Sequence, residues 1–492
     1  MAKKRTAAGP TGRKTRAGFA GSDVETPDTP DYVVVELRYE SPVAFTASKF
    51  VAPAAGERQA ETLNNVLEKY DIRTLRSHFA LPASTVKARV DVAATLPPAP
   101  EPSKFAKKGM NTEFIHSGFA QVVPGKSSDA RKIARELNQK GAVWQAYVAP
   151  RPVPAVVASG SQAGSRNFEP SQGYLHAAPN GIGAIEAWGV SGGKGNGVTI
   201  CDIEANWNRS HEDLPSGITL IGGTVINDLG WRNHGTAVLG EMVAIPDARG
   251  IAGISHAARA TVHSAVLAGV FNAAGAITNA AAKLVAGDVI LLELQATGPN
   301  GKYVAMQYWD DIYSAIVAAT ARGITVVEAA GNGNENFDLA MFNNTGLQKD
   351  SGAIVVGAGV PPTNHFDVDT GYQGIGVPRS RIWFSNYGKI VSVQAWGWHV
   401  TTLGYGDAQG GSSENTWYTL RFSGTSSASP IITGAVACLQ GHAKSKNGKP
   451  MTPDKVRKIL MATGTPQQAG PGVPLTQNIG PQPNLPKAMA LV

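Results

Sequence analysis

Three residues capable of acyl-transfer chemistry each stand where an apolar segment meets a run of small or polar residues. Ser426 and His234 each begin a segment with the apolar character of a helix, and Asp202 ends the apolar run 198–202. A hydroxyl can attack a carbonyl carbon when an imidazole takes its proton and a carboxylate holds that imidazole. Alone, each residue more often has a structural role, as a turn-capping Asp or a hydrogen-bonded core His. Together they predict nucleophilic catalysis, provided that the fold brings them together.

Asn332 adds a donor for the negative charge that such a reaction develops on the carbonyl oxygen. It follows the run 326–330 and Gly331, a pattern typical of a buried strand that ends in a turn. A Gly-Asn turn is the structural interpretation, whereas the functional one aims the side-chain NH₂ at an oxyanion. Ser426 would stand at a helix N-terminus, where the helix dipole favours negative charge.

Short β-branched runs alternate with longer helical patterns over the larger part of the chain. The predicted strands are 198–202, 261–267, 288–294, 324–328 and 353–356, and the predicted helices include 277–286 and 307–321. This alternation is typical of βαβ units, so we expect an α/β fold with a doubly wound, mostly parallel sheet and helices on both faces. Ligands of such folds lie beyond the carboxyl ends of the strands.

The order Asp202, His234, Asn332 and Ser426 resembles that of the subtilisin-like serine proteases, the subtilases of peptidase family S8. The segment 424–430, Gly-Thr-Ser-Ser-Ala-Ser-Pro, is similar to the family's Gly-Thr-Ser-Met-Ala-Ser-Pro and differs only at Ser427. The resemblance covers roughly residues 180–463 and predicts a subtilisin-like fold.

Further motifs extend this resemblance. His-Gly-Thr at 234–236 is followed by Ala237, where a second His is common, and Ala-Ala-Gly-Asn at 329–332 is intact. His-Glu-Asp-Leu at 211–214 resembles the His-Pro-Asp-Leu that follows the family's catalytic Asp, and Phe-Ser-Asn-Tyr-Gly at 384–388 resembles its Phe-Ser segment.

The resemblance implies a serine endopeptidase in which Ser426 is the nucleophile, His234 the general base and then acid, and Asp202 the orienting carboxylate. Asn332 and the backbone N–H of Ser426 would form the oxyanion hole. No cofactor is expected to be required, although calcium is a frequent family ligand to which Asp213 or the segment 332–338 could contribute. Two alternatives remain, a catalytically idle subtilisin fold used as a binding or scaffolding module and an esterase with the same triad.

The substrate pocket departs from the family pattern. Where the family usually has Ser-Leu-Gly along one pocket wall, this chain has Glu293, Leu294 and Gln295, and the resemblance places Ala329, Ala330 and Gly331 on the other wall. Glu293 and Glu328 could face the pocket and favour a basic substrate side chain, or point away into a polar network. Broad or apolar preference is the alternative specificity.

The residues before this region predict a separate unit. Strand and helix patterns alternate over 31–150, as in a small α+β domain of ferredoxin-like type. Its size and position resemble the family's propeptide, so we expect a zymogen whose N-terminal domain assists folding and inhibits. The Pro-, Gly- and Ser-rich stretch 151–172 predicts a linker, 173–492 the catalytic domain with a Pro/Gly-rich tail, and 1–30 a basic disordered tail.

Composition and charge exclude several other classes. Apolar residues make up 42% and charged residues 16% of the 492, which is typical of a globular protein. The net charge of +7 is concentrated in residues 1–22, so we expect a solvated tail and no nucleic-acid partner. We also expect no membrane partner; the partners would be polypeptide substrates and the chain's own N-terminal domain.

The tail lacks the apolar run of a signal peptide, which leaves the location open between cytoplasm and non-classical export. Cys201 and Cys438 are predicted to be buried and unpaired.

Overall fold

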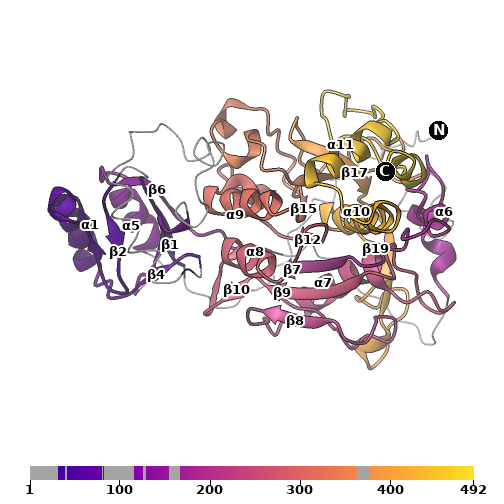
Figure 1. Cartoon of the computed structure of the whole chain (residues 1–492), viewed down its shortest axis with the longest axis horizontal. Helices are drawn as coiled ribbons and strands as arrows, with labels where there is room; N and C mark the ends of the chain where they lie inside the picture. The colour runs from indigo at the N-terminus through magenta and orange to yellow at the C-terminus, as the bar shows by residue number, and fades with distance from the viewer. Residues whose placement is uncertain are drawn as a thin grey trace, which may run out of the picture.

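A seven-stranded sheet organises the larger part of the molecule (Figure 1). The computed structural model describes residues 31–38, 41–79, 81, 116–125, 129–153, 167–362 and 376–492. The strand order is β17-β16-β15-β12-β7-β9-β8, and every neighbouring pair is parallel. The bounds are β7 (Thr199–Glu204), β8 (Thr219–Gly222), β9 (Arg259–Ser264), β12 (Val289–Leu292), β15 (Thr325–Ala329), β16 (Ile354–Gly359) and β17 (Val391–Trp396).

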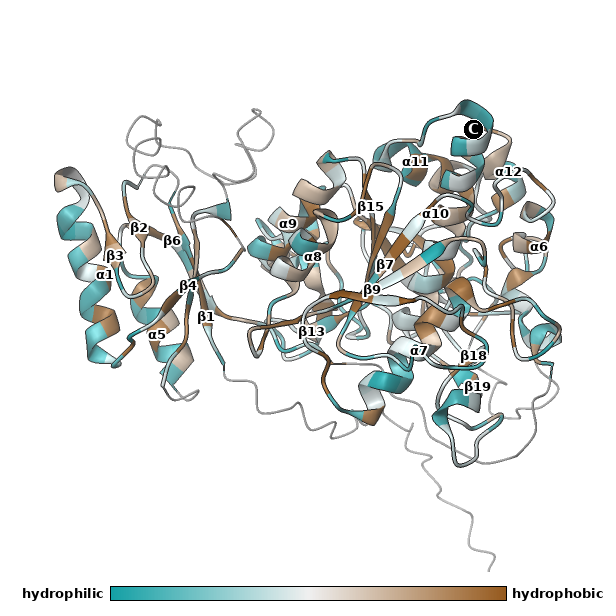
Figure 2. Cartoon of the chain, turned by 60° about the horizontal axis from the view of Figure 1, so that its bottom comes forward, coloured by the Kyte–Doolittle hydropathy of each residue, from teal (hydrophilic) through white to brown (hydrophobic). Residues whose placement is uncertain are grey.

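Helices cover both faces of this sheet, as expected for an α/β fold. One face carries α6 (Ala184–Ala187), α7 (Leu229–Val243), α10 (Thr425–Asn447), α11 (Pro453–Thr463) and α12 (Leu485–Met489), and the other carries α8 (Ala273–Ala281) and α9 (Asp310–Ala321). On β12, Val289 and Leu291 pack into the first core, whereas Ile290 and Leu292 pack into the second. Because successive strand residues point to opposite faces, a wholly apolar strand is what a sheet buried on both sides requires. The apolar strands lie between these helices in Figure 2. The predicted fold class is confirmed.

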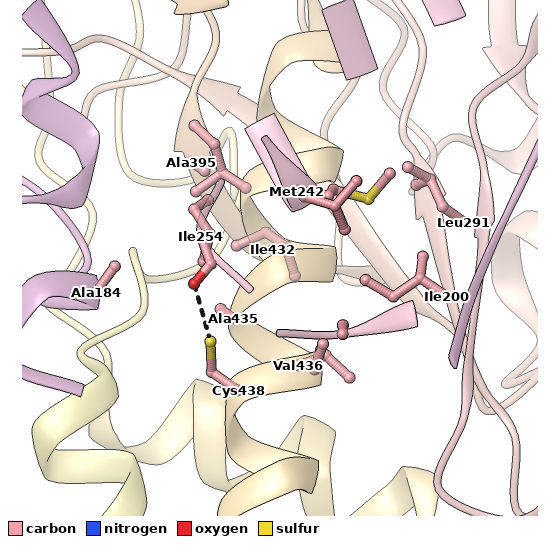
Figure 3. Close-up of a cluster of buried hydrophobic side chains, with 14 of the residues drawn as sticks. Ala184, Ile200, Met242, Ile254, Leu291, Ala395, Ile432, Ala435, Val436 and Cys438 are labelled. Atoms are coloured by element: carbon pink, nitrogen blue, oxygen red, sulfur yellow. Dashed lines mark hydrogen bonds between the residues drawn. The ribbon is translucent and has the colours of Figure 1, made fainter. Parts of the chain in front are cut away.

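The largest helix, α10, forms much of the first core. Figure 3 shows Ile432, Ala435 and Val436 of α10 among buried side chains from other elements. Cys438 Sγ lies 3.3 Å from the backbone oxygen of Ile254, and both Cys201 and Cys438 are buried and unpaired, as predicted. Among the described helices, none combines the length and the apolar composition needed to cross a membrane.

Residues 33–148 contain a second, four-stranded antiparallel sheet in the order β4-β5-β1-β6. Its elements are β1 (Val33–Leu37), α1 (Glu57–Lys69), β4 (Leu75–Ser77), β5 (Phe119–Val122), α5 (Ala130–Leu137) and β6 (Val143–Val148). This βαββαβ order matches the ferredoxin-like arrangement expected from the sequence. The predicted tail 1–30 and most of the predicted linker lie outside the described residues.

The two faces of this small sheet have different partners. Val33, Val35 and Leu37 pack against α1 and α5, whereas Val34 belongs to the core that contains α8 and α9. Phe79 and Phe119 join Val34 there. The small sheet is therefore covered on one side by its own helices and on the other by the larger part of the molecule, as Figures 1 and 2 show.

Short two-stranded pairs complete the structure. They are β2 (Ala44–Phe45) with β3 (Phe50–Val51), β10 (Val266–Leu267) with β11 (Val270–Phe271), β13 (Gln295–Thr297) with β14 (Tyr303–Ala305), and β18 (Val400–Leu403) with β19 (Tyr418–Phe422). Two of the predicted helices begin at other residues than expected. The helix predicted from 277 begins at Ala273, because the Asn272 side chain accepts the Gly275 N–H and caps it. The helix predicted from 307 begins at Asp310, after a 3-10 turn over Met306–Tyr308.

Candidate active site

Ser426 lies in the first turn of α10, directly after a sharp strand-to-helix turn. Gly424 precedes the helix with φ 123° and ψ 179°, a conformation that side chains with a Cβ rarely adopt. Glycine at this position lets β19 turn into α10 within three residues. The turn leaves Ser426 at the positive end of a 23-residue helix, with only 6% of its surface exposed.

His234 is fully buried in α7. Asp228 caps this helix by accepting the Trp231 N–H at 2.8 Å, which explains why the helix begins where it does. The imidazole packs edge-on against Phe422 of β19, with ring centroids 5.4 Å apart. Burial lowers the pKa of His234 to about 4, so the imidazole is neutral at neutral pH.

The carboxylate that holds His234 is Glu204, and the expectation that Asp202 does so is corrected. Nδ1 of His234 lies 2.6 Å from Oε2 of Glu204. Asp202 instead accepts the indole N–H of Trp207 at 2.6 Å. The sequence interpretation ended the strand at Asp202, but β7 continues to Glu204 with Ile203 buried between them. The apolar Ile203 was the available signal that the strand, and with it the edge of the sheet, extended two residues further.

Asp202 and Glu204 point to the same face of β7, because they are two residues apart, and both are fully buried. Burial raises the pKa of both carboxyl groups well above the usual values, and the charge of Glu204 raises that of Asp202 further. Hydrogen bonding between the two groups raises the pKa of Asp202 and lowers that of Glu204. Burial thus disfavours a negative charge on either carboxyl group, and Glu204 is the one of the two that contacts His234.

The side chain of Asn332 has a fixed orientation. Its Oδ1 accepts hydrogen bonds from the backbone N–H of Thr425 at 2.9 Å and from the Thr425 hydroxyl at 3.0 Å. The Nδ2 end of the amide is thereby turned away from Thr425. The preceding Gly331, with φ 88°, donates its N–H to the same hydroxyl at 3.1 Å. The end of β15 and the first turn of α10 are thus joined next to Ser426.

The two glutamates considered for the substrate pocket lie in different surroundings. Glu293, which is 1% exposed, is hydrogen-bonded through Oε2 to the Ser429 hydroxyl of α10. Glu328 accepts the backbone N–H of Gln307 at 2.7 Å and so points toward the turn before α9. Burial raises the pKa of each to about 8. The structure thus gives both carboxyl groups partners within the protein core.

The structure also describes the positions of the other residues predicted for the substrate pocket. Leu294 and Ala330 pack into the core that contains α8 and α9, and Ala329 is 1% exposed on β15. Gln295 begins β13, and its Oε1 accepts the backbone N–H of Asn332 at 2.8 Å. Gln295 is thus the residue of this set that links β13 to Asn332.

The segment that follows β6 reaches this site. Val153 forms an antiparallel bridge with Gln295, and its backbone N–H lies 3.2 Å from the Gln295 oxygen. A backbone segment paired with the free side of β13 has the geometry of an added strand.

The residues considered for calcium have protein partners. Asp213 Oδ2 accepts the Ile251 N–H at 2.8 Å, and Asp338 Oδ1 accepts the Lys389 N–H at 3.0 Å. Over the described ranges, the structure contains no group of three or more His, Cys, Asp and Glu that could hold a metal ion.

These elements define a parallel α/β fold in which Glu204 contacts His234, and Asn332 contacts Thr425, the residue before Ser426. The family model of the subtilases, peptidase family S8, matches residues 195–480, which is more than half of the chain. The chain therefore belongs to the subtilase family of serine proteases.

Solved structures are similar to this chain at low sequence identity. Fervidolysin from Fervidobacterium pennivorans, a keratinolytic enzyme related to subtilisin, is 16% identical with a TM-score of 0.51. The match covers 94% of this chain and 61% of fervidolysin, so the chain spans about three fifths of that protein. A protease from Pseudoalteromonas arctica is 21% identical with a TM-score of 0.48, over 67% of this chain and 99% of that one. A search of curated proteins found no match.

Proposed function

We propose that this protein is a serine endopeptidase whose triad is Ser426, His234 and Glu204. The observation that carries the proposal is the 2.6 Å contact between His234 Nδ1 and Glu204 Oε2, in a chain of the subtilase family. Glu204 would accept a hydrogen bond from Nδ1–H, so Nε2 keeps its lone pair and can accept a proton. Nε2 is buried and has no hydrogen-bond partner among the described residues.

Peptide hydrolysis would proceed by acylation and deacylation. Ser426 Oγ attacks the carbonyl carbon while its proton moves to His234 Nε2, and the carboxylate of Glu204 stabilises the imidazolium. Asn332 Nδ2 and a backbone N–H at the start of α10 would receive the oxyanion. His234 then protonates the leaving amine. A water molecule that gives its proton to His234 attacks the acyl group in the same way, and the bond to Ser426 breaks to release the acid. The low pKa of His234 keeps the resting imidazole unprotonated and ready to act as a base.

A fluorophosphonate probe tests this proposal, because it labels an activated serine. Wild-type protein should be labelled, and Ser426→Ala should not. Ser427→Ala is the matched control, since Ser427 is also a buried serine of the same helical turn but donates its hydroxyl proton toward backbone oxygens of Trp396 and Gly424. Absence of labelling in folded wild-type protein would favour the idle, scaffolding alternative.

We further propose that the N-terminal domain, 31–150, inhibits the peptidase in a zymogen. The support is the pairing of Val153 with Gln295, which lies next to Asn332, because a paired segment there occupies the position of a substrate strand. Self-cleavage is then expected within 154–166, between this pairing and the larger domain. Intact-mass analysis should find wild-type protein cut in that segment and Ser426→Ala uncut; an uncut, fully active wild type would refute the zymogen.

A further inference from the structure

The Ser429 hydroxyl has two oxygen partners that cannot both be satisfied by its own proton. Ser429 Oγ lies 2.8 Å from the backbone oxygen of Thr425, one helical turn earlier, and is also hydrogen-bonded to Glu293 Oε2. A hydroxyl carries a single hydrogen, whereas a backbone carbonyl and a carboxylate are both acceptors. Both contacts are hydrogen bonds only when one partner supplies a proton, and of the two partners only the glutamate can carry one.

The surroundings of Glu293 favour the protonated carboxyl group. The side chain is buried at the end of β12, and Oε1 receives no hydrogen bond from a described residue. The titratable groups that interact with it are Asp202 and Glu204 of β7 and His234 and Glu241 of α7, whereas α10 contributes the hydroxyls of Ser426 and Ser429. These include three further carboxyl groups and no permanent cation, so a negative charge on Glu293 would be poorly compensated.

We infer that Glu293 is a neutral carboxylic acid whose O–H donates to Ser429 and thereby positions the start of α10 for catalysis. Ser429 donates its own hydrogen to the Thr425 carbonyl oxygen, and Thr425 donates hydrogen bonds from its N–H and hydroxyl to the Asn332 amide oxygen. These hydrogen bonds thus connect Glu293, at the end of β12, to Thr425, the residue before Ser426, and through it to Asn332. The inference rests on the proposed peptidase function and adds a positioning residue and a pH limit to that site.

Loss of the Glu293 proton has two consequences. The carboxylate can no longer donate, so Ser429 must turn its hydrogen away from Thr425. The new negative charge also lies close enough to Ser426 for that hydroxyl to affect the pKa of Glu293, and it opposes the negative charge that develops during attack. Because burial places this pKa at about 8, activity should fall above that pH.

The test is the pH dependence of kcat/KM on a fluorogenic peptide for wild type, Glu293→Gln and Glu328→Gln. Wild type should lose about tenfold in kcat/KM for each pH unit above about 8. Glu293→Gln keeps an N–H donor and cannot ionise, so it should retain activity near neutrality without this alkaline loss. Glu328→Gln is the matched control, because Glu328 is equally buried with a similar pKa but binds Gln307. It should keep the wild-type profile. A Glu293→Gln profile that falls like wild type would overturn the inference.

Ser429→Ala provides the second variant if Glu293→Gln does not fold. Removing the acceptor destabilises the acid form, so the alkaline loss should move to lower pH. A move to higher pH would show that Ser429 donates to a carboxylate, and the inference would be wrong.

Infrared spectroscopy separates this inference from the peptidase proposal. In folded Ser426→Ala protein at neutral pH, the carbonyl stretch of a protonated carboxyl group should be present and should weaken when Glu293→Gln is added. If the folded wild type has no peptidase activity, the proposed function is refuted, but the infrared band still tests the protonation of Glu293. If the band does not weaken in the Glu293→Gln variant, only the inference that Glu293 is neutral is refuted.

Discussion

Asp202 and Glu204 show how two residues on one strand face take different roles. Both carboxyl groups are buried, but the longer side chain at the end of β7 reaches His234, while Asp202 is held by Trp207. Burial and the neighbouring charge of Glu204 raise the pKa of Asp202, so a second negative charge beside Glu204 is disfavoured. We therefore expect Asp202 to act as a positioning residue for Glu204.

Exchange of each acid for its amide should separate these roles. Glu204→Gln removes the charge that stabilises the imidazolium and presents an N–H or neutral oxygen to Nδ1, so kcat/KM should fall by about 10³–10⁴. Asp202→Asn keeps a neutral hydrogen-bond donor beside Glu204 and should cost less than about tenfold. Steady-state kinetics of the wild type and both variants on the same fluorogenic peptide measure the two losses in kcat/KM. A larger loss in Asp202→Asn than in Glu204→Gln would return Asp202 to the triad.

At the scale of elements, the turn between β19 and α10 sets the position of Ser426, the proposed nucleophile. Gly424 adopts a conformation that costs other residues about 1–3 kcal/mol, and the bonds from Thr425 to Asn332 join this turn to β15. The strand-to-helix turn and Asn332, the proposed oxyanion donor, are therefore joined by hydrogen bonds.

Gly424→Ala should disturb this turn. We expect a loss of stability of about 1–3 kcal/mol and a fall in kcat that exceeds any change in KM, because the strain displaces Ser426 relative to His234. Denaturant unfolding and steady-state kinetics measure the two effects. Gly448→Ala is the control, since Gly448 also has a positive φ of 67° but follows the far end of α10. Equal loss of kcat in both variants would contradict the argument.

Glu328 connects the buried strand β15 to the pH dependence of stability. Its pKa of about 8 in the folded protein exceeds the unfolded value of about 4.3, so the folded protein holds this proton more tightly. Its contribution to stability is complete below about pH 4 and is lost as the pH rises through about 8. In a Ser426→Ala background, Glu328→Gln should therefore show a smaller fall in Tm between about pH 5 and pH 9. An equal fall would show that Glu328 is ionised in the folded state.

At the scale of the whole molecule, the small domain is attached through buried polar contacts as well as apolar ones. Asp311 in the first turn of α9 lies 2.6 Å from His78 Nε2 and accepts the Tyr147 hydroxyl at 2.5 Å. Asn272 donates to the His78 backbone oxygen at 2.8 Å. These polar groups are removed from water where the two parts of the molecule pack together. A group left there without its hydrogen-bond partner would therefore weaken the interface.

Removal of one hydroxyl tests the inhibitory role of this interface. Tyr147→Phe leaves Asp311 with one hydrogen bond fewer and should weaken domain attachment by about 1.5–3 kcal/mol. The full-length variant should then gain peptidase activity faster after purification than wild type. Tyr70→Phe is the control, because Tyr70 donates to Glu136 within the small domain. Equal rates for all three proteins would argue against inhibition through this interface.

The sequence by itself was sufficient to predict the parallel α/β fold and to single out Ser426, His234 and Asn332. These signals are local. A helix start, a Gly-rich turn and an apolar run each depend on neighbouring residues, and their order along the chain resembles the subtilase pattern. The ferredoxin-like unit could be predicted for the same reason, from alternating strand and helix patterns.

The tertiary structure decided which acid faces the imidazole and where each buried glutamate points. Glu204 meets His234 across 30 positions of the sequence, and Glu293 meets Ser429 across 136. Such pairings depend on where each strand ends and on the face of the sheet to which its last side chains point. A shift of one residue moves these side chains to the opposite face. The bridge between Val153 and Gln295 likewise joins two segments that only the packing of the small sheet against α8 and α9 brings together.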